Sequence, residues 1–235
     1  MLTQYLTQTQ NLLQAPTASN ALYNTETLTG YINTARGQIA GEAQCVQYFT
    51  SFTTTAGNRS YPFSSIPNSP SAGIQAAFAV KTLWYTNNGG NTRIQFQSFE
   101  WFSLYNLNEP TQSSGIPTTW TQYGQGTGGQ IWFDPVPDNT YTISVDGLWY
   151  PIELVDDTTI EAIPYFFTDA VPYYAAYLAL LSAQIGVRTQ QSDEMYKRYE
   201  EFMSRARNAV TSPVLPWQYE KTPIPGGLNA APAGR

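Results

Sequence analysis

The chain has 235 residues, enough for one large domain or two small ones with a sizeable core. It contains no histidine and a single cysteine, Cys45, which excludes Ser-His triads, Cys-His dyads, an intrachain disulfide and a thiolate metal cluster. A net charge of -6 without a lysine and arginine stripe argues against a nucleic-acid groove, so we expect no catalytic, cofactor or metal site.

The composition instead favours a protein that associates with other proteins. Charged residues make up 12% of the chain, about half of the roughly 25% that is usual for soluble domains. Aromatic residues reach 14%, and tryptophan and tyrosine are enriched at protein interfaces. Residues 1–14 lack the basic start and apolar core of a signal peptide, and the apolar run 173–181 is too short to span a membrane. We therefore expect synthesis in the cytoplasm.

Two helices are predicted in the first part of the chain. Apolar residues recur at helical spacing over 2–14, and Pro16 ends that segment. Asn24 or Thr25 can cap a second helix, which we predict over 24–41. One apolar stripe runs along this second helix, formed by Leu28, Tyr31, Ile32, Ala35 and Ile39.

Beyond the second helix the pattern changes to strands. Segments 44–55, 75–86 and 92–105 are rich in β-branched and aromatic residues, which favours strands. Asn88-Gly89 lies between the second and third segments and is a strong hairpin signal. Cys45 lies where the strand pattern begins, and we expect it to be a buried structural cysteine. Short strands with regular turns predict an antiparallel β-sandwich.

The most regular strand signals come after a glycine-rich segment. Residues 109–129 predict a loop that is mobile or ordered by a partner, rather than a phosphate cradle. Segments 131–134 and 141–145 then alternate apolar and polar side chains with the period of two expected of half-buried strands. Two prolines, Asp138 and Asn139 lie between them and predict a tight connection.

Helices return after Pro164. We expect a deeply packed helix over 169–186, capped by Asp169 and ended by Gly186. A second, amphipathic helix is predicted over 192–210. Its methionine and aromatic stripe is more typical of a core than of a cofactor site.

The predicted fold class is therefore α+β. The N- and C-terminal helices, residues 1–43 and 160–211, form a discontinuous helical bundle domain, and residues 44–159 form an inserted antiparallel β-sandwich domain. Residues 212–235 form an extended arm, because their five prolines exclude a helix or a central strand. The arm is either a strap across its own domain or a segment that docks on a partner. We predict a partner interface at Leu215, Pro216, Trp217 and Tyr219.

The sequence also leaves two other functions open. Two pairs of acids, Asp134 with Asp138 and Asp156 with Asp157, are candidates for the paired carboxylates of a glycoside hydrolase. Acids solvated in turns are the simpler interpretation. The aromatic and asparagine-rich β region can also form the face of a carbohydrate-binding module of a phage tail or fibre, although a buried core explains its rings more simply.

The whole pattern resembles the head-to-tail adaptor, or connector, proteins of tailed bacteriophages. The resemblance spans residue 2 to about residue 210 and contains no catalytic signature. It also includes the alanine- and tyrosine-rich helix after Pro164. The segments that carry it are Tyr31-Ile-Asn-Thr-Ala-Arg-Gly-Gln-Ile-Ala-Gly-Glu42, Ile131-Trp-Phe-Asp-Pro-Val-Pro-Asp-Asn-Thr-Tyr141 and Leu148-Trp-Tyr-Pro-Ile-Glu-Leu154.

The resemblance implies a structural virion protein rather than an enzyme. Such adaptors assemble as rings, usually of twelve subunits, beneath the portal at the head–tail junction. The implied partners are further copies of the chain, the portal protein and a tail or nozzle protein. Double-stranded DNA passes through the lumen of such a ring without specific binding, and no membrane is involved. The glycine-rich loop and the proline-spaced arm are less typical of these adaptors.

Overall fold

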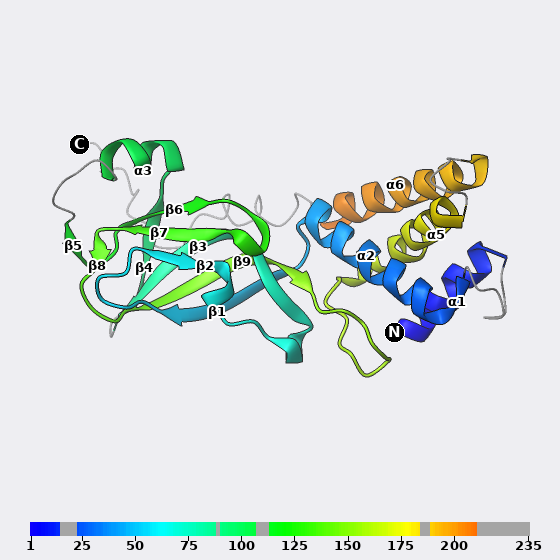
Figure 1. The fold of residues 1–235 in the computed structure, drawn as a ribbon, viewed down its shortest axis with the longest axis horizontal. Helices are drawn as coiled ribbons and strands as arrows, with labels where there is room; N and C mark the ends of the chain where they lie inside the picture. Colours follow the sequence, from blue (N-terminus) through cyan, green and yellow to red (C-terminus); the bar gives the residue numbers. More distant parts are fainter. Residues whose placement is uncertain (15–22, 88–89, 107–112, 184–188, 211–235) are drawn as a thin grey trace, which may run out of the picture.

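The computed structural model describes residues 1–14, 23–87, 90–106, 113–183 and 189–210, in which helices pack against one end of a curled β-sheet (Figure 1). The predicted α+β class is confirmed. The helices are α1 (Leu2–Leu12), α2 (Thr25–Ala43), α3 (Phe99–Asn106), α4 (Tyr165–Thr168), α5 (Ala170–Ala183) and α6 (Gln190–Val210). The strands are β1 (Gln47–Thr53), β2 (Ser60–Pro62), β3 (Ile74–Asn87), β4 (Gly90–Phe96), β5 (Ser114–Gly115), β6 (Thr119–Tyr123), β7 (Gln130–Asp134), β8 (Val136–Pro137) and β9 (Thr142–Pro151).

Helix α2 begins as the sequence predicts. Asn24 has an extended backbone, and its side-chain oxygen accepts a hydrogen bond of 2.7 Å from the Thr27 N–H. This bond satisfies one of the donors that a helix start leaves free. The helix ends at Gln44, which adopts the left-handed conformation with φ 50°. The predicted stripe is largely buried, with Leu28, Ile32, Ala35 and Ile39 inaccessible to solvent.

Helix α5 lies among the other helices and contacts α1, α2 and α6. The prediction that Asp169 caps it was wrong, because Asp169 has helical backbone angles and links α4 directly to α5. The predicted end at Gly186 lies outside the described residues. Helix α6 begins two residues before the predicted Ser192, since the side chains of Thr189 and Ser192 accept hydrogen bonds from each other's N–H at 3.3 and 2.9 Å.

The β region is one curled sheet with the strand order β1-β9-β3-β4-β6-β7-β2. Its pairs are antiparallel except β4 with β6, which run parallel. The sheet curls until its two edge strands approach each other, and the rings of Phe52 on β1 and Tyr61 on β2 have centroids 5.4 Å apart. The predicted hairpin is confirmed, because Asn87 of β3 pairs with Gly90 of β4, while Asn88 and Gly89 lie outside the described residues.

Two sequence predictions in this region were wrong. The predicted strand 92–105 stops at Phe96, and helix α3 follows because Ser98 accepts hydrogen bonds from the next turn through its side chain and its carbonyl. The predicted loop 109–129 contains strand β6, which pairs with β4 and β7.

Strands β7 and β9 form where predicted, but they do not pair with each other. The connection between β7 and β9 contains a cis Asp134-Pro135 peptide bond. It leads from β7, which lies beside the edge strand β2, to β9, which lies beside the edge strand β1.

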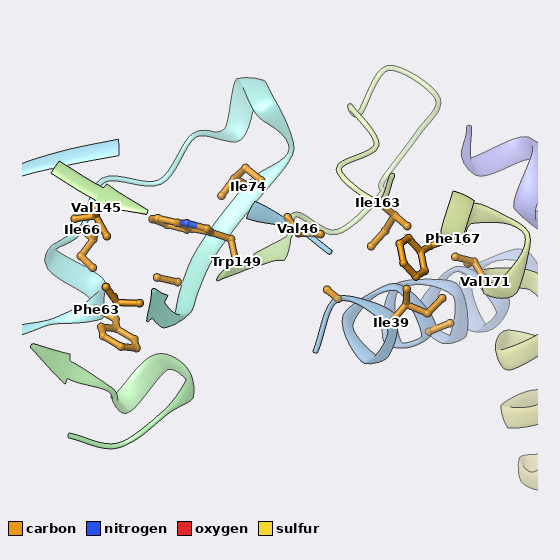
Figure 2. Packing of buried hydrophobic residues seen from close by; sticks show 14 of the residues in the cluster. Ile39, Val46, Phe63, Ile66, Ile74, Val145, Trp149, Ile163, Phe167 and Val171 are labelled. Atoms are coloured by element: carbon orange, nitrogen blue, oxygen red, sulfur yellow. The ribbon is translucent and has the colours of Figure 1, made fainter. Parts of the chain in front are cut away.

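One continuous cluster of buried apolar side chains joins the sheet to the helices (Figure 2). Trp149 of β9 is inaccessible to solvent, and its ring nitrogen donates to the Tyr48 carbonyl at 3.2 Å. Val46 lies between this tryptophan and the helical residues Ile39 and Phe167 in Figure 2. The shared core therefore fixes how the sheet and the helices are placed relative to each other.

Candidate assembly interface

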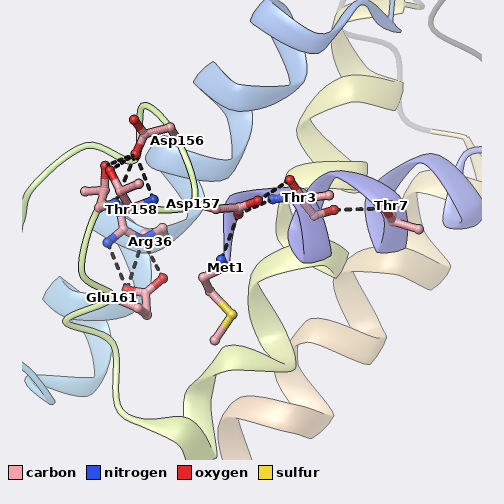
Figure 3. Close-up of polar contacts among 9 residues, drawn as sticks. Met1, Thr3, Thr7, Arg36, Asp156, Asp157, Thr158 and Glu161 are labelled. Carbon is pink, nitrogen blue, oxygen red and sulfur yellow. Dashed lines mark hydrogen bonds and ion pairs between the residues drawn. The ribbon is translucent and has the colours of Figure 1, made fainter.

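A buried polar clamp holds the segment after β9 against helix α2. The Arg36 guanidinium, only 1% exposed, donates to both carboxylate oxygens of Glu161 at 2.8 to 3.1 Å (Figure 3). It also donates to the Ile152 carbonyl at 2.7 Å. One turn earlier, Asn33 accepts from the Leu154 N–H at 2.8 Å and donates to the Leu154 carbonyl at 3.1 Å. These bonds satisfy a buried charge and fix the course of the segment.

The exposed part of the same segment is held by two acids (Figure 3). The Asp156 carboxylate accepts hydrogen bonds from Thr158 and Thr159, and these bonds lower its pKa. The Asp157 carboxylate accepts from the α-amino group of Met1 at 2.8 Å and from the Thr3 N–H at 2.8 Å. These hydrogen bonds hold the pKa of Asp157 far below its usual range. Of the predicted acid pair, Asp156 therefore stabilises a turn and Asp157 holds the start of α1.

The other predicted acid pair also makes structural contacts. Asp134 forms an ion pair of 3.4 Å with Arg59, and both side chains are largely buried. Asp138 accepts a hydrogen bond from the Tyr141 hydroxyl, which raises the pKa of Tyr141 to about 12. The four predicted acids thus favour turn and ion-pair roles over a glycosidase pair. The aromatic core likewise accounts for Trp120, Trp149 and Phe133, which are almost fully buried.

Two groups of large apolar side chains are exposed. The first, which we call the junction surface, lies on the clamped segment and the start of α4, where Tyr165 is 80% and Phe166 is 59% exposed. It comprises Val155, Ile160, Tyr165 and Phe166. The second, the α3 surface, comprises Phe96, Trp101, Leu104 and Tyr123 on β4, α3 and β6. Exposed apolar groups of this kind mark sites of protein contact when they are contiguous.

The ends of α2 and α6 are joined close to the start of β1. Tyr199 is buried and donates to the Glu42 carboxylate at 2.8 Å, and burial together with this carboxylate raises the pKa of Tyr199. Arg207 in the last turns of α6 lies 3.6 Å from the same carboxylate and donates to the Glu42 carbonyl at 3.3 Å. The C-terminal end of α6 therefore lies beside the α2–β1 connection.

A sequence comparison matches residues 2–217 to the family described as SU10 adaptor protein. This range begins with α1 and extends past the end of α6. The chain belongs to the SU10 adaptor protein family. The resemblance to phage adaptor proteins is thereby confirmed, and the chain is a structural component of a bacteriophage virion. No curated protein matches it.

The interface predicted for this SU10 adaptor at Leu215, Pro216, Trp217 and Tyr219 lies outside the described residues. The family match includes the first three of these positions and ends before Tyr219. In the described part of the adaptor no helix is long and apolar enough to cross a membrane. The same described residues hold no group of three Cys, Asp or Glu side chains placed to bind a metal ion.

Cys45 of this adaptor differs from its prediction in one respect. The side chain is half-buried rather than fully buried. Burial raises the pKa of the Cys45 thiol to about 11, so the thiol is protonated near neutral pH. A protonated, partly covered thiol is a weak nucleophile, in keeping with a structural role.

Proposed function

We propose that this phage adaptor assembles as a ring of twelve copies beneath the portal, joins the capsid to the tail and lines the channel through which DNA leaves. The family match over residues 2–217 carries the proposal. The junction surface and the α3 surface support it, because a ring subunit needs apolar contacts with neighbours and with the proteins above and below.

We further propose that the chain divides into the helical bundle, residues 1–43 and 160–211, and the inserted β unit, residues 44–159. The shared core, the bond from Arg36 to the Ile152 carbonyl and the bonds between Asn33 and Leu154 support a rigid connection between the two units. A rigid subunit suits a ring that must keep its shape while the portal and the tail or nozzle protein bind its opposite ends.

The charge of the chain fits a channel through which DNA slides. Each copy carries a net charge of -6, so twelve copies carry 12 × -6 = -72. A negative lumen would not retain phosphate groups. Repulsion between copies is screened beyond about 8 Å at physiological salt, so apolar contacts between neighbours can outweigh it.

We assign the C-terminal arm to partner binding, through Leu215, Pro216, Trp217 and Tyr219. A segment with five prolines over 212–235 gains little from helix or sheet of its own, yet it keeps a tryptophan and a tyrosine. Aromatic anchors dominate the binding energy of many interfaces.

The function can be tested in the phage that encodes the chain. A nonsense mutation in the gene should yield heads that package DNA but lack tails, and the supplied wild-type gene should restore tailed particles. Quantitative mass spectrometry of purified particles should give equal copy numbers of the chain and the portal protein. Tailed, infectious particles that lack the chain would overturn the proposal. The variant Asp138→Asn, which leaves the largely buried Asp134–Arg59 ion pair in place, should restore tailed particles as fully as the parent chain.

A further inference from the structure

Among the residues that the structure describes, the backbone groups along the outer edge of strand β1 have no hydrogen-bond partner. Trp149 donates its N–H to the Val46 carbonyl at 3.0 Å, and Thr54 donates its N–H to the Tyr141 carbonyl at 2.9 Å. Bonds of this kind recur at every second residue of an antiparallel ladder, so the even-numbered residues of β1 bond to β9. The backbone N–H and C=O groups that point away from β9 therefore belong to Gln47, Phe49, Ser51 and Thr53. In the described part of the chain β1 is a terminal strand of the sheet.

The opposite edge of the sheet, β2, is protected. Phe133 donates to the Arg59 carbonyl and Phe63 donates to the Gly129 carbonyl, so the odd-numbered residues of β2 bond to β7. Pro62 then faces outward, where a proline has no N–H to offer a further strand. Strand β1 is seven residues long and contains no proline, glycine or charged residue. Natural proteins usually protect or cover edges of this kind. Because β1 lacks these protective residues, another strand can add to it.

Tyr61 determines where the run of unpaired backbone groups along β1 ends. Its hydroxyl accepts from the Thr55 N–H at 2.8 Å and donates to the Thr55 carbonyl at 3.1 Å, which closes the edge beyond β1. A groove lies beside the end of β1 and is lined by Ser51, Thr53, Tyr61 and Pro62 among others. Phe49 is 56% exposed on the outer face, and its ring lies 5.7 Å from that of Trp84. Large side chains of an added strand would pack on this exposed ring.

One segment of the chain has the sequence of such a strand. Residues 217–222, Trp-Gln-Tyr-Glu-Lys-Thr, lie between Pro216 and Pro223, and each has a backbone N–H. Trp217 and Tyr219 alternate with polar residues, so both rings fall on one face of an extended strand. The prolines limit the strand to six residues, and the free edge of β1 offers seven.

The place where α6 ends and the length of the linker that follows favour addition to a neighbouring copy. Helix α6 ends beside Glu42, which lies five residues before the first residue of β1. Residues 211–216 include two prolines and span about 20 Å when extended. A linker of this length cannot bring residue 217 to the far end of its own β1, about 23 Å beyond the start of that strand, as antiparallel addition within one copy would require.

We propose that residues 217–222 of one copy add as an extra strand to the outer edge of β1 in a neighbouring copy. The inference rests on the proposed ring. The contact is heterologous, because the arm of each copy binds a different surface, the β1 edge, of the next copy. Repeated from copy to copy, it closes into a ring. The backbone bonds supply affinity, and the two aromatic rings beside Phe49 supply specificity.

Amide hydrogen exchange of the full-length chain tests the contact, compared between purified particles and the isolated protein. In particles, peptides covering β1 and residues 217–222 should both exchange at least tenfold more slowly than in the isolated chain. Equal protection in a monomeric isolated chain would show that each arm binds its own β1 and would overturn the proposal. Protection of β1 with a freely exchanging arm would assign the edge to the portal or tail protein. Free exchange at both segments would show that no strand is added to β1 and would overturn the proposal. The proposed ring would not be contradicted by that result, because the adaptor would still be present in the particles.

A proline variant provides a second test. Ser51→Pro removes an outward N–H and keeps the bonds between β1 and β9, whereas Ser51→Thr keeps the donor. Ser51→Pro should lower the titre of infectious particles at least tenfold and abolish protection of residues 217–222, and Ser51→Thr should match the parent. Wild-type protection of the arm in Ser51→Pro particles would contradict the proposal. If Ser51→Pro does not fold, the exchange measurement on the wild-type chain decides.

Discussion

Arg36 and Glu161 form a bidentate ion pair between residues 125 positions apart, with the guanidinium 1% exposed and the carboxylate 10% exposed. Glu161 also accepts from the Ile163 N–H at 2.8 Å. The pair therefore joins α2 to the segment that leads into α4. Because that segment carries the junction surface, the position of the surface depends on a bond buried beneath it.

Glu161→Ala should strongly destabilise the fold. It leaves the Arg36 guanidinium buried without its carboxylate, which costs about 3–5 kcal/mol and lowers Tm by roughly 10 °C. Thermal unfolding followed by circular dichroism would measure the change. Glu201→Ala is a matched control, because Glu201 pairs with Arg198 at 3.0 Å on the exposed face of α6 and should cost less than about 1 kcal/mol. Equal losses in the two variants would show that the buried pair has no special role.

Asp157 should make the stability of the chain depend on pH in the acid range. The hydrogen bonds from Met1 and Thr3 lower its folded pKa, so its contribution is fully present above the unfolded pKa of about 3.9. The contribution is lost as the pH falls through the lower folded pKa. The difference in Tm between the parent and Asp157→Asn should therefore be largest near neutral pH and shrink in acid. The exposed Glu200→Gln variant is the control, and the same narrowing in that variant would refute a specific role of Asp157.

Two glycines should respond in opposite directions to alanine. Gly30 lies exposed within α2 with open space around its Cα, so Gly30→Ala should stabilise the chain by about 0.5–1 kcal/mol. Gly73 has φ +74°, and an added Cβ would lie 2.7 Å from the Ile160 carbonyl oxygen. Gly73→Ala should cost about 2 kcal/mol or more, through backbone strain and this contact. Urea denaturation would measure both changes, and a neutral Gly73→Ala would contradict the close approach of the Ile160 carbonyl to Gly73.

Local signals in the sequence predicted the elements that depend on neighbours along the chain. The Asn24 cap and the apolar stripe that follows it predict α2, and the Asn88-Gly89 signal predicts the pairing of β3 with β4. Helix α3 was missed because its aromatic residues also suit a strand. Ser98 is a helix-start signal that was available for it.

The candidate interface was less predictable than the fold. Arg36 lies inside the apolar stripe of α2, four residues after Ile32 and three before Ile39, which is a signal for a buried, paired charge. The partner, Glu161, follows only from the three-dimensional fold, since no pattern links residues so far apart in sequence. The order of strands around the curled sheet depends on contacts of the same long range.

Tyr165 and Phe166 should affect assembly without affecting the fold. Both rings are mostly exposed, so Tyr165→Ser and Phe166→Ser should change the free energy of unfolding by no more than about 0.5 kcal/mol. Aromatic anchors at interfaces contribute about 2 kcal/mol or more, so each variant should bind its partner roughly 30-fold more weakly. Titration of the purified chain onto tailless, portal-containing heads would measure binding through the concentration that restores infectivity. Lys197→Ser on the exposed face of α6 provides the control. Equal restoration by the Tyr165, Phe166 and Lys197 variants would show that the junction surface is not an assembly contact.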